Sequence, residues 1–265
     1  MLKTTTEGTA YEVHGPEEAP VVVLIHGLGL SRGLWGPHLE TLARPYRVLA
    51  YDLLGHGDSK PASGTISLSS FSDQLLRLLD ELGIARAALI GFSIGGMINR
   101  RFATDHPDRV SSLIILNSPH DRGAEAQKLV EERAAKVRDE GRMATMESAL
   151  ERWFTPEFRA AHPAWLETVR TWRAQADPES YAQAAWVLAH GVRELIQPQP
   201  QISAPSLVMT CENDSGSTPD MSRAIAAEID GASLHIVPRL KHLGLLEDPY
   251  AFTTPTLGFL ERTAE

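Results

Sequence analysis

The 265-residue sequence lacks three features that would each point to a particular class of protein. It has a single cysteine, Cys211, so no intrachain disulfide can form. No apolar run approaches the roughly 18 residues that a membrane-spanning helix requires, and residues 1–20 have no apolar segment flanked by Lys or Arg. We therefore expect no signal peptide, no membrane association and a cytoplasmic protein.

Basic runs and metal-binding motifs are also missing. The 25 Lys and Arg residues stand against 34 Asp and Glu residues, a net charge of −9, which argues against a nucleic-acid partner. There is no H-E-x-x-H, no cysteine pair and no phosphate-binding G-x-G-x-x-G, so we expect neither a metal nor an organic cofactor. Hydrophobic residues make up 43% of the chain and charged residues 22%, which is enough apolar material for a large core.

Short aliphatic runs recur along the chain and predict buried strands. They lie at residues 21–25, 47–51, 87–90, 113–116, 207–210 and 234–237. Between the second and third runs, residues 68–82 place Phe and Leu at helical spacing. This alternation predicts an α/β protein with a mostly parallel central sheet that helices cover on both faces.

Residues 121–200 interrupt the alternation, because they contain only three glycines and are rich in Ala, Glu and Arg. We expect a core domain of residues 1–120 and 201–265, with 121–200 inserted as a helical cap. Four of the five tryptophans lie in this insertion. Most should pack it onto the core, and Trp153 and Trp186 are our candidates for substrate binding, since apolar walls are typical of small-molecule pockets. If the substrate is carboxylated, one of the nine arginines of the insertion should bind it, but helix periodicity does not identify which.

The sharpest local signal is an apolar strand that runs into Gly91-Phe92-Ser93-Ile94-Gly95 and then into a helical stretch. This G-x-S-x-G pattern is typical of a sharp strand-to-helix turn that exposes a serine hydroxyl. The glycines on either side leave room for the strand and the helix to approach. Ser93 is therefore the predicted nucleophile.

A serine hydroxyl needs a general base, and ten histidines are candidates. His242 follows the last predicted strand, at the carboxyl side of a parallel sheet where active sites collect. His120 also follows a strand end, and we include it as a candidate substrate-binding residue, although a surface loop position is the commoner outcome. For three others a structural role bonded to nearby backbone is favoured: His26, His56 and His106.

An acid must orient that base, and Asp214 follows the strand at 207–210. Glu212 is its main competitor, but we favour Asp214 on its position relative to the strand and expect Glu212 to be a solvated or turn-stabilising carboxylate. The chain order Ser93, Asp214, His242 is the order of nucleophile, acid and base in one particular fold. For the oxyanion we expect two backbone N–H donors, from Ile94 after the nucleophile and from Leu28 in the glycine-containing loop after the first aliphatic run.

Taken together, these motifs resemble the α/β-hydrolase fold with a helical cap. The matching segments are 26–29, the D-x-x-G-x-G-x-S turn at 52–59, the elbow at 91–96, 106–110, Asp214 with 218–219, and His242 with Glu247 and Pro249. Within the family they look most like 3-oxoadipate enol-lactonases and small bacterial carboxylesterases. Phe92 and Leu243 depart from the carbon–carbon hydrolases of ring-cleavage pathways, which usually have Asn and Trp there, and Lys241 departs from the enol-lactonases, where a small residue is usual.

The resemblance implies a serine hydrolase that cleaves an ester or lactone of a small organic molecule through an acyl-enzyme. Carbon–carbon bond hydrolysis and cofactor-free perhydrolysis or oxygenation are alternatives on the same fold. A ligand receptor built on a hydrolase scaffold is an alternative from another class. The expected partner is the small-molecule substrate, and a homodimer is compatible with the sequence.

Overall fold

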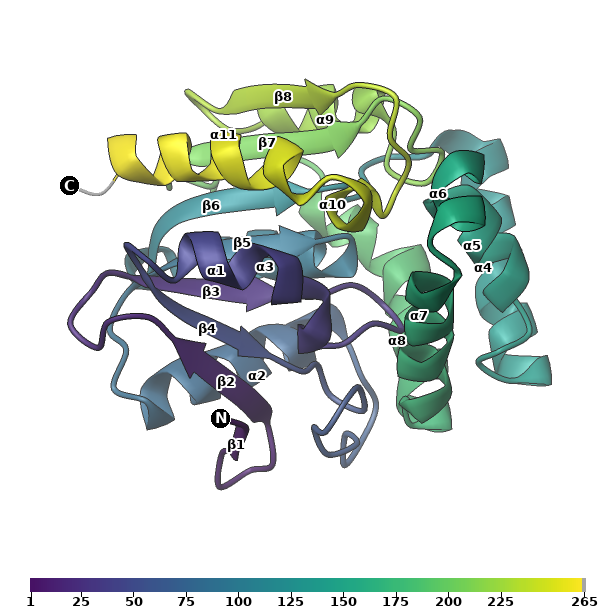
Figure 1. Cartoon of the computed structure of the whole chain (residues 1–265), viewed down its shortest axis with the longest axis horizontal. Coiled ribbons are helices and arrows are strands. Elements are labelled where there is room, and N and C mark those ends of the chain that lie inside the picture. Colours follow the sequence, from purple (N-terminus) through teal and green to yellow (C-terminus); the bar gives the residue numbers. More distant parts are fainter. Residues whose placement is uncertain (264–265) are drawn as a thin grey trace.

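A computed structural model of the chain describes residues 1–263, which build a central eight-stranded sheet (Figure 1). The strands are β1 (Lys3–Thr4), β2 (Ala10–His14), β3 (Val21–Ile25), β4 (Arg47–Tyr51), β5 (Ala87–Phe92), β6 (Val110–Leu116), β7 (Ser206–Cys211) and β8 (Ser233–Val237). They are ordered β1-β2-β4-β3-β5-β6-β7-β8. The strands from β3 to β8 run parallel, and β2 is antiparallel to both β1 and β4. All six aliphatic runs form strands, whereas β1 and β2 were not predicted.

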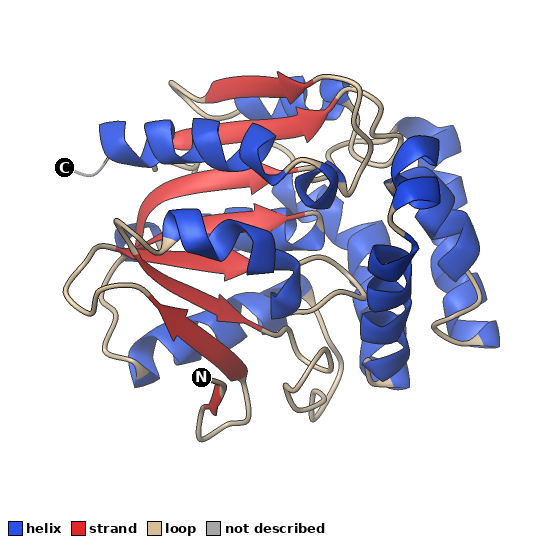
Figure 2. Ribbon diagram, viewed as in Figure 1, coloured by secondary structure: helices blue, strands red, loops and turns tan. Residues whose placement is uncertain are grey.

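Helices cover both faces of this sheet (Figure 2). The α-helices of the core are α1 (Gly36–Leu42), α2 (Leu68–Glu81), α3 (Ile94–Asp105), α9 (Pro219–Ala227), α10 (Gly244–Glu247) and α11 (Pro249–Arg262). Short 3₁₀ helices lie at η1 (Arg32–Trp35), η2 (Pro107–Arg109) and η3 (Gly191–Leu195). Helices α1 and α11 pack together on the face nearer the viewer in Figure 1, and α2, α3 and α9 lie on the other.

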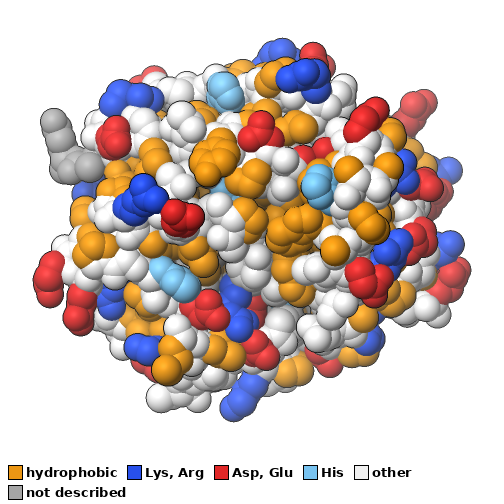
Figure 3. Space-filling view, in the orientation of Figure 1, with side chains coloured by type: hydrophobic (Ala, Val, Ile, Leu, Met, Phe, Trp, Pro, Cys, Tyr) orange, Lys and Arg blue, Asp and Glu red, His pale blue; other side chains and the backbone are white. Residues whose placement is uncertain are grey.

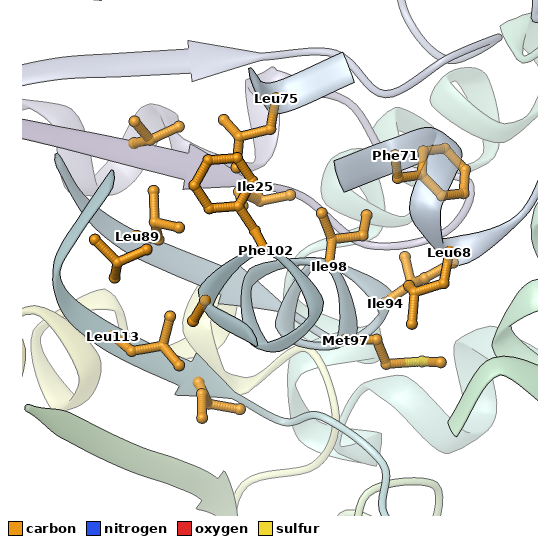
Figure 4. Packing of buried hydrophobic residues seen from close by; sticks show 14 of the residues in the cluster. Ile25, Leu68, Phe71, Leu75, Leu89, Ile94, Met97, Ile98, Phe102 and Leu113 are labelled. Carbon is orange, nitrogen blue, oxygen red and sulfur yellow. The ribbon is translucent and has the colours of Figure 1, made fainter. Parts of the chain in front are cut away.

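Each face buries its own hydrophobic cluster. Around α3, Ile98 and Phe102 point toward β-strand residues such as Leu89 and toward Leu75 of α2 (Figure 4). The opposite cluster includes Phe252 of α11. These side chains are at most 1% exposed, so the sheet is held rigidly from both sides and its strand ends are fixed platforms for side chains.

Residues between β6 and β7 form five helices at one end of the sheet. They are α4 (Gly123–Glu140), α5 (Met146–Trp153), α6 (Pro156–Ala161), α7 (Pro163–Gln175) and α8 (Pro178–His190). Figure 1 shows them beyond the arrowheads of the parallel strands, at the end where β5, β6, β7 and β8 finish. The helix-rich content expected for 121–200 is present, and this helical segment, which we call the cap, faces the carboxyl ends of the strands.

None of the helices in residues 1–263 combines the length and the hydropathy needed to cross a bilayer.

Candidate active site

Ser93 lies at the turn between β5 and α3 in a strained backbone conformation. Its φ of 57° and ψ of −116° lie where residues with side chains are rarely found. A Cβ at Gly91 would lie 2.1 Å from the carbonyl oxygen of Gly95, and a Cβ at Gly95 would lie 2.3 Å from that of Ile25. The two glycines of the motif are therefore required by backbone atoms that approach each other closely, and the turn holds the Ser93 hydroxyl at the carboxyl end of β5.

A chain of hydrogen bonds links the three residues that the sequence singled out. His242 Nδ1 donates to Asp214 Oδ2 at 2.6 Å, which leaves Nε2 to accept from the Ser93 hydroxyl at 3.2 Å. Asp214 follows β7 and His242 follows β8. Three segments that are far apart in the sequence thus meet at the carboxyl ends of β5, β7 and β8, in an arrangement able to remove a proton from a serine hydroxyl.

The Asp214 carboxylate is almost completely buried and is bonded through both oxygens. Oδ1 accepts from the N–H groups of Gly216 and Ser217 at 2.8 and 3.0 Å, and Oδ2 accepts from the Asn117 side chain at 2.9 Å. Burial alone would raise its pKa, but the interaction with His242 and the hydrogen bonds from His242, Asn117 and Ser217 outweigh it and hold the pKa below the ordinary value. Asp214 is therefore ionised at neutral pH.

Asn117 was missed by the sequence analysis. It directly follows β6, and its backbone has a φ of 46°. Its position after an aliphatic run was a visible signal, because every parallel strand of this sheet ends at the same edge. Its amide orients the acid rather than contacting Ser93.

The competing acid and the other histidines have structural contacts instead. Glu212 is exposed, and its Oε2 accepts from the Arg239 N–H at 2.8 Å, which is the turn-stabilising alternative. His26 bonds the Gly27 carbonyl and the Leu53 N–H, and His56 bonds a backbone carbonyl. Burial lowers the pKa of both His26 and His56 to about 4, so both are neutral at pH 7.

Two backbone N–H groups are candidate donors for an oxyanion. The N–H groups of Leu28 and Ile94 have no hydrogen-bond acceptor among residues 1–263. Ile94 is the first residue of α3, where N–H groups lack partners inside the helix, and Leu28 lies in the loop after β3 and lines the same cavity as Ser93. Free donors beside a nucleophile are what a developing oxyanion requires.

The cavity between core and cap has a volume of about 120 Å³. Ser93, Phe92 and His242 line it from the core, and Trp153 and Tyr181 line it from the cap. The ring centroids of Phe92 and Trp153 lie 4.9 and 6.0 Å from that of His242. Of the candidate substrate-binding residues, Trp153 is therefore at the cavity.

The other two candidates are placed elsewhere. Trp186 is 48% exposed on α8 and packs on His190, because it lies one residue further round the helix than Ala185, which faces the cavity. His120 is buried, with Nε2 3.0 Å from Glu228 at the end of α9. Within the described part of the chain neither lines the cavity, so the substrate-binding expectation for both is corrected.

No group of three or more His, Cys, Asp or Glu side chains in residues 1–263 is arranged to hold a metal ion.

Comparison with known proteins places this geometry in a family. The family model described as alpha/beta hydrolase fold matches residues 20–249. The 3-oxoadipate enol-lactonase 2 of Acinetobacter baylyi is 29% identical over 95% of this chain and 92% of its own length. The (E)-2-((N-methylformamido)methylene)succinate hydrolase of the same organism is 26% identical over 99% and 98%.

Solved structures agree with these relatives. The crystal structure of the enol-lactonase from Burkholderia xenovorans is similar with a TM-score of 0.89 and 29% identity, over 98% of this chain and 100% of that one. The resemblance and the fold class inferred from the motifs are thereby confirmed. The chain belongs to the α/β-hydrolase fold family.

Proposed function

We propose that this hydrolase cleaves an ester or lactone bond of a small organic substrate with Ser93 as nucleophile, His242 as general base and Asp214 as the orienting acid. The hydrogen-bond chain from Ser93 through His242 to the buried Asp214 is the observation on which the proposal depends. The names of relatives, an enol-lactonase among them, support a bond of this class.

Acyl transfer in this geometry has two steps. In the first, His242 Nε2 takes the proton of the Ser93 hydroxyl as its oxygen attacks the substrate carbonyl, and the resulting oxyanion accepts from the N–H groups of Ile94 and Leu28. His242 then returns the proton to the leaving oxygen and an acyl-Ser93 forms. In the second step, water loses a proton to His242 and attacks the acyl group, and Ser93 leaves with that proton. Asp214 stays ionised and stabilises the imidazolium in both steps.

The test is proton release at constant pH on short-chain esters, enol-lactones and saturated lactones, with one ring-cleavage diketone for the carbon–carbon alternative. Ser93→Ala should lose several orders of magnitude in turnover, because it removes the nucleophile. Ser72→Ala is the matched control, since Ser72 is equally buried but lies in α2 in the core. Retention of most esterase or lactonase activity by Ser93→Ala would contradict the proposal.

A further inference from the structure

Four arginines of the cap and its entry turn line the cavity opposite Ser93. Arg122 and Arg133 lie at the start and in the middle of α4, Arg152 lies in α5 and Arg173 in α7. We call these four residues the arginine cluster. Three helices that are separate in sequence thus contribute arginines to the lining of one small cavity.

The arginine cluster has no acidic partner. Across residues 1–263, no carboxylate oxygen lies within 4.0 Å of a nitrogen of these four side chains, whereas Arg170 of the same cap pairs with Glu147 at 2.8 Å and with Glu167 at 3.5 Å. Arg173 is buried and the other three are half-buried, and cations removed from water are normally paired or bound to a ligand, because an unpaired buried charge costs several kcal/mol. The absence of an acidic partner for these arginines among residues 1–263 therefore needs an explanation.

The contacts that the arginine cluster makes are to neutral groups that orient it. Arg122 donates to the carbonyl oxygens of Leu188 and Ala189, and its buried Nε has no partner among the described residues. Arg173 is 2% exposed, donates to Thr145 Oγ1 at 3.3 Å, and its Nε is also unpartnered. Guanidinium groups held in place by neutral groups keep their full positive charge, and a guanidinium binds a carboxylate through two parallel hydrogen bonds.

Aromatic rings fix the position of Arg173 relative to the chemistry. Its guanidinium carbon lies 5.0 Å from the Trp153 ring and 5.4 Å from the Tyr181 ring. The Trp153 ring in turn lies 6.0 Å from that of His242. A Cβ at Gly29, in the loop that bears the Leu28 N–H, would be 3.2 Å from Arg173 Nε. An anion on Arg173 therefore lies beside the reacting centre rather than at the cavity mouth.

The positive charges of the arginine cluster lie close enough to repel one another. Burial, followed by repulsion from Arg133, lowers the pKa of both Arg122 and Arg152 to about 10, and Arg173 adds to the repulsion on Arg152. All remain protonated at neutral pH. Arg133 is thus a neighbour of both Arg122 and Arg152, Arg173 is a further neighbour of Arg152, and Arg152 lies near Asp214. Asp214 is the acidic residue among those lining the cavity, and His242 engages it.

We propose that the substrate is a dianion, an ester or lactone bearing two carboxylates that the arginine cluster holds. The proposal rests on the proposed acyl-transfer function and names its substrate class. A single carboxylate would leave most of the four positive charges of the cluster uncompensated, whereas two carboxylates give the cluster a second anionic partner. The apolar side chains of Val130, Val137 and Leu188 between these groups suit a short hydrocarbon chain.

The kinetic test compares three esters with the same acetyl group. O-acetylmalate is a dianion at neutral pH, O-acetyllactate a monoanion and ethyl O-acetyllactate is neutral. We expect kcat/KM to fall in that order, by about 10- to 100-fold per carboxylate removed, since each loses charge-assisted hydrogen bonds. Equal kcat/KM for the three esters, or a preference for the neutral one, with hydrolysis still dependent on Ser93, would overturn the dianion proposal and leave the proposed function intact.

Substitutions of single arginines test which residues produce the preference for the dianion. Arg133→Gln should lower the ratio of kcat/KM for the dianion to that for the neutral ester by about tenfold or more, and Arg133→Lys should recover part of the ratio because it restores the charge without the planar fork. Arg152→Gln repeats the test from α5. Arg170→Gln is the matched control, since Arg170 lies in the same cap outside the cavity, and the ratio should not change. An unchanged ratio in both Gln variants would overturn the assignment.

Binding to the Ser93→Ala protein separates the anion site from the chemistry. Succinate, a dianion without a scissile bond, should raise the Tm of this variant more than propionate does, and Arg133→Gln should remove the difference. This outcome supports the dianion site even if none of the three esters is hydrolysed, in which case the proposed function fails alone. Equal Tm with succinate and with propionate would overturn the dianion site whatever the turnover.

Discussion

Gly95→Ala tests whether the nucleophile turn depends on backbone contact that a single methyl group destroys. The added Cβ would lie 2.3 Å from the Ile25 carbonyl oxygen and 2.8 Å from that of His26. The first distance is about 1.1 Å short of the 3.4 Å at which ordinary contact begins. Both neighbours are backbone atoms at the end of β3, so no side chain can rotate away, and either the elbow or the start of the Leu28 loop must move.

Both segments that could move are part of the proposed machinery. A shift of the elbow displaces Ser93 and the Ile94 N–H, and a shift of the β3 end displaces the Leu28 N–H. A misplacement of about 1 Å in a catalytic group costs about 10²-fold in rate, and overpacking costs about 1–3 kcal/mol of stability. We therefore expect kcat/KM to fall by about 100-fold and Tm to fall by several degrees, since about 1 kcal/mol corresponds to about 2–4 °C for a protein of this size.

The assay is ester or lactone turnover with thermal unfolding measured on the same preparation. Gly36→Ala is the matched control, because Gly36 begins α1 with a helical φ of −44° and a Cβ there meets nothing within 4 Å. That variant should keep its activity and its Tm, with a slight gain in stability from reduced freedom of the unfolded chain. Wild-type kcat/KM and Tm in Gly95→Ala would refute the steric argument for the elbow.

Two further predictions concern the acid and the buried histidines. Asp214→Asn should lower kcat by about 10³- to 10⁴-fold, because a neutral amide neither holds the His242 tautomer nor stabilises the imidazolium. The control variant Glu212→Gln should keep its turnover. Similar losses in both variants would argue against Asp214 as the acid. Burial lowers the pKa of His38 to about 4, so between about pH 6.5 and pH 4 the unfolded chain binds the extra proton and His38 reduces the free energy of unfolding by up to about 1.4 kcal/mol per unit fall in pH. Urea titrations across this range give the free energy of unfolding at each pH. The slope of this free energy against pH should be shallower by about that amount in His38→Gln. An unchanged slope would mean that His38 does not titrate with unfolding.

Five of the six parallel strands could be predicted because they are buried on both faces, whereas the edge strand β8 is exposed over its first three residues and was found from its aliphatic run alone. Strands buried on both faces are continuous aliphatic runs, as in β3 with the sequence Val-Val-Val-Leu-Ile, and they contrast with their surroundings. The antiparallel strand β2 could not be found in this way, since its residues Glu12 and His14 are partly exposed and only its first two residues are buried. The proposed nucleophile, acid and base were visible for a related reason, because each lies in the segment that follows a parallel strand, at the carboxyl end of the sheet.

The sequence predicts that the cap is helical, but it does not predict which faces of the cap helices turn toward the cavity. Helix α8 shows why, since Tyr181, Ala185 and Leu188 face the cavity at helical spacing while Trp186 points outward. Nothing in the local sequence distinguishes the two faces, because both contain apolar residues. His120 depends on an even more distant partner, Glu228, which is 108 residues further along the chain.

The net charge of the chain is negative while the arginine cluster in the cavity is positive, so the net charge gives the wrong impression of the proposed ligand. A net charge of −9 argues against an extended polyanion, which must contact a wide surface, and the face seen in Figure 3 has acidic and basic side chains interspersed. A small anion in the cavity meets a different field. Surface charges are screened over a Debye length of about 8–10 Å, whereas the arginine cluster acts at contact distance on a ligand in the cavity, where screening is weaker. The proposed preference for a dianion thus depends on side chains from three cap helices. The sequence does not show it, because only the packing of these helices shows that no carboxylate of residues 1–263 pairs with the four arginines.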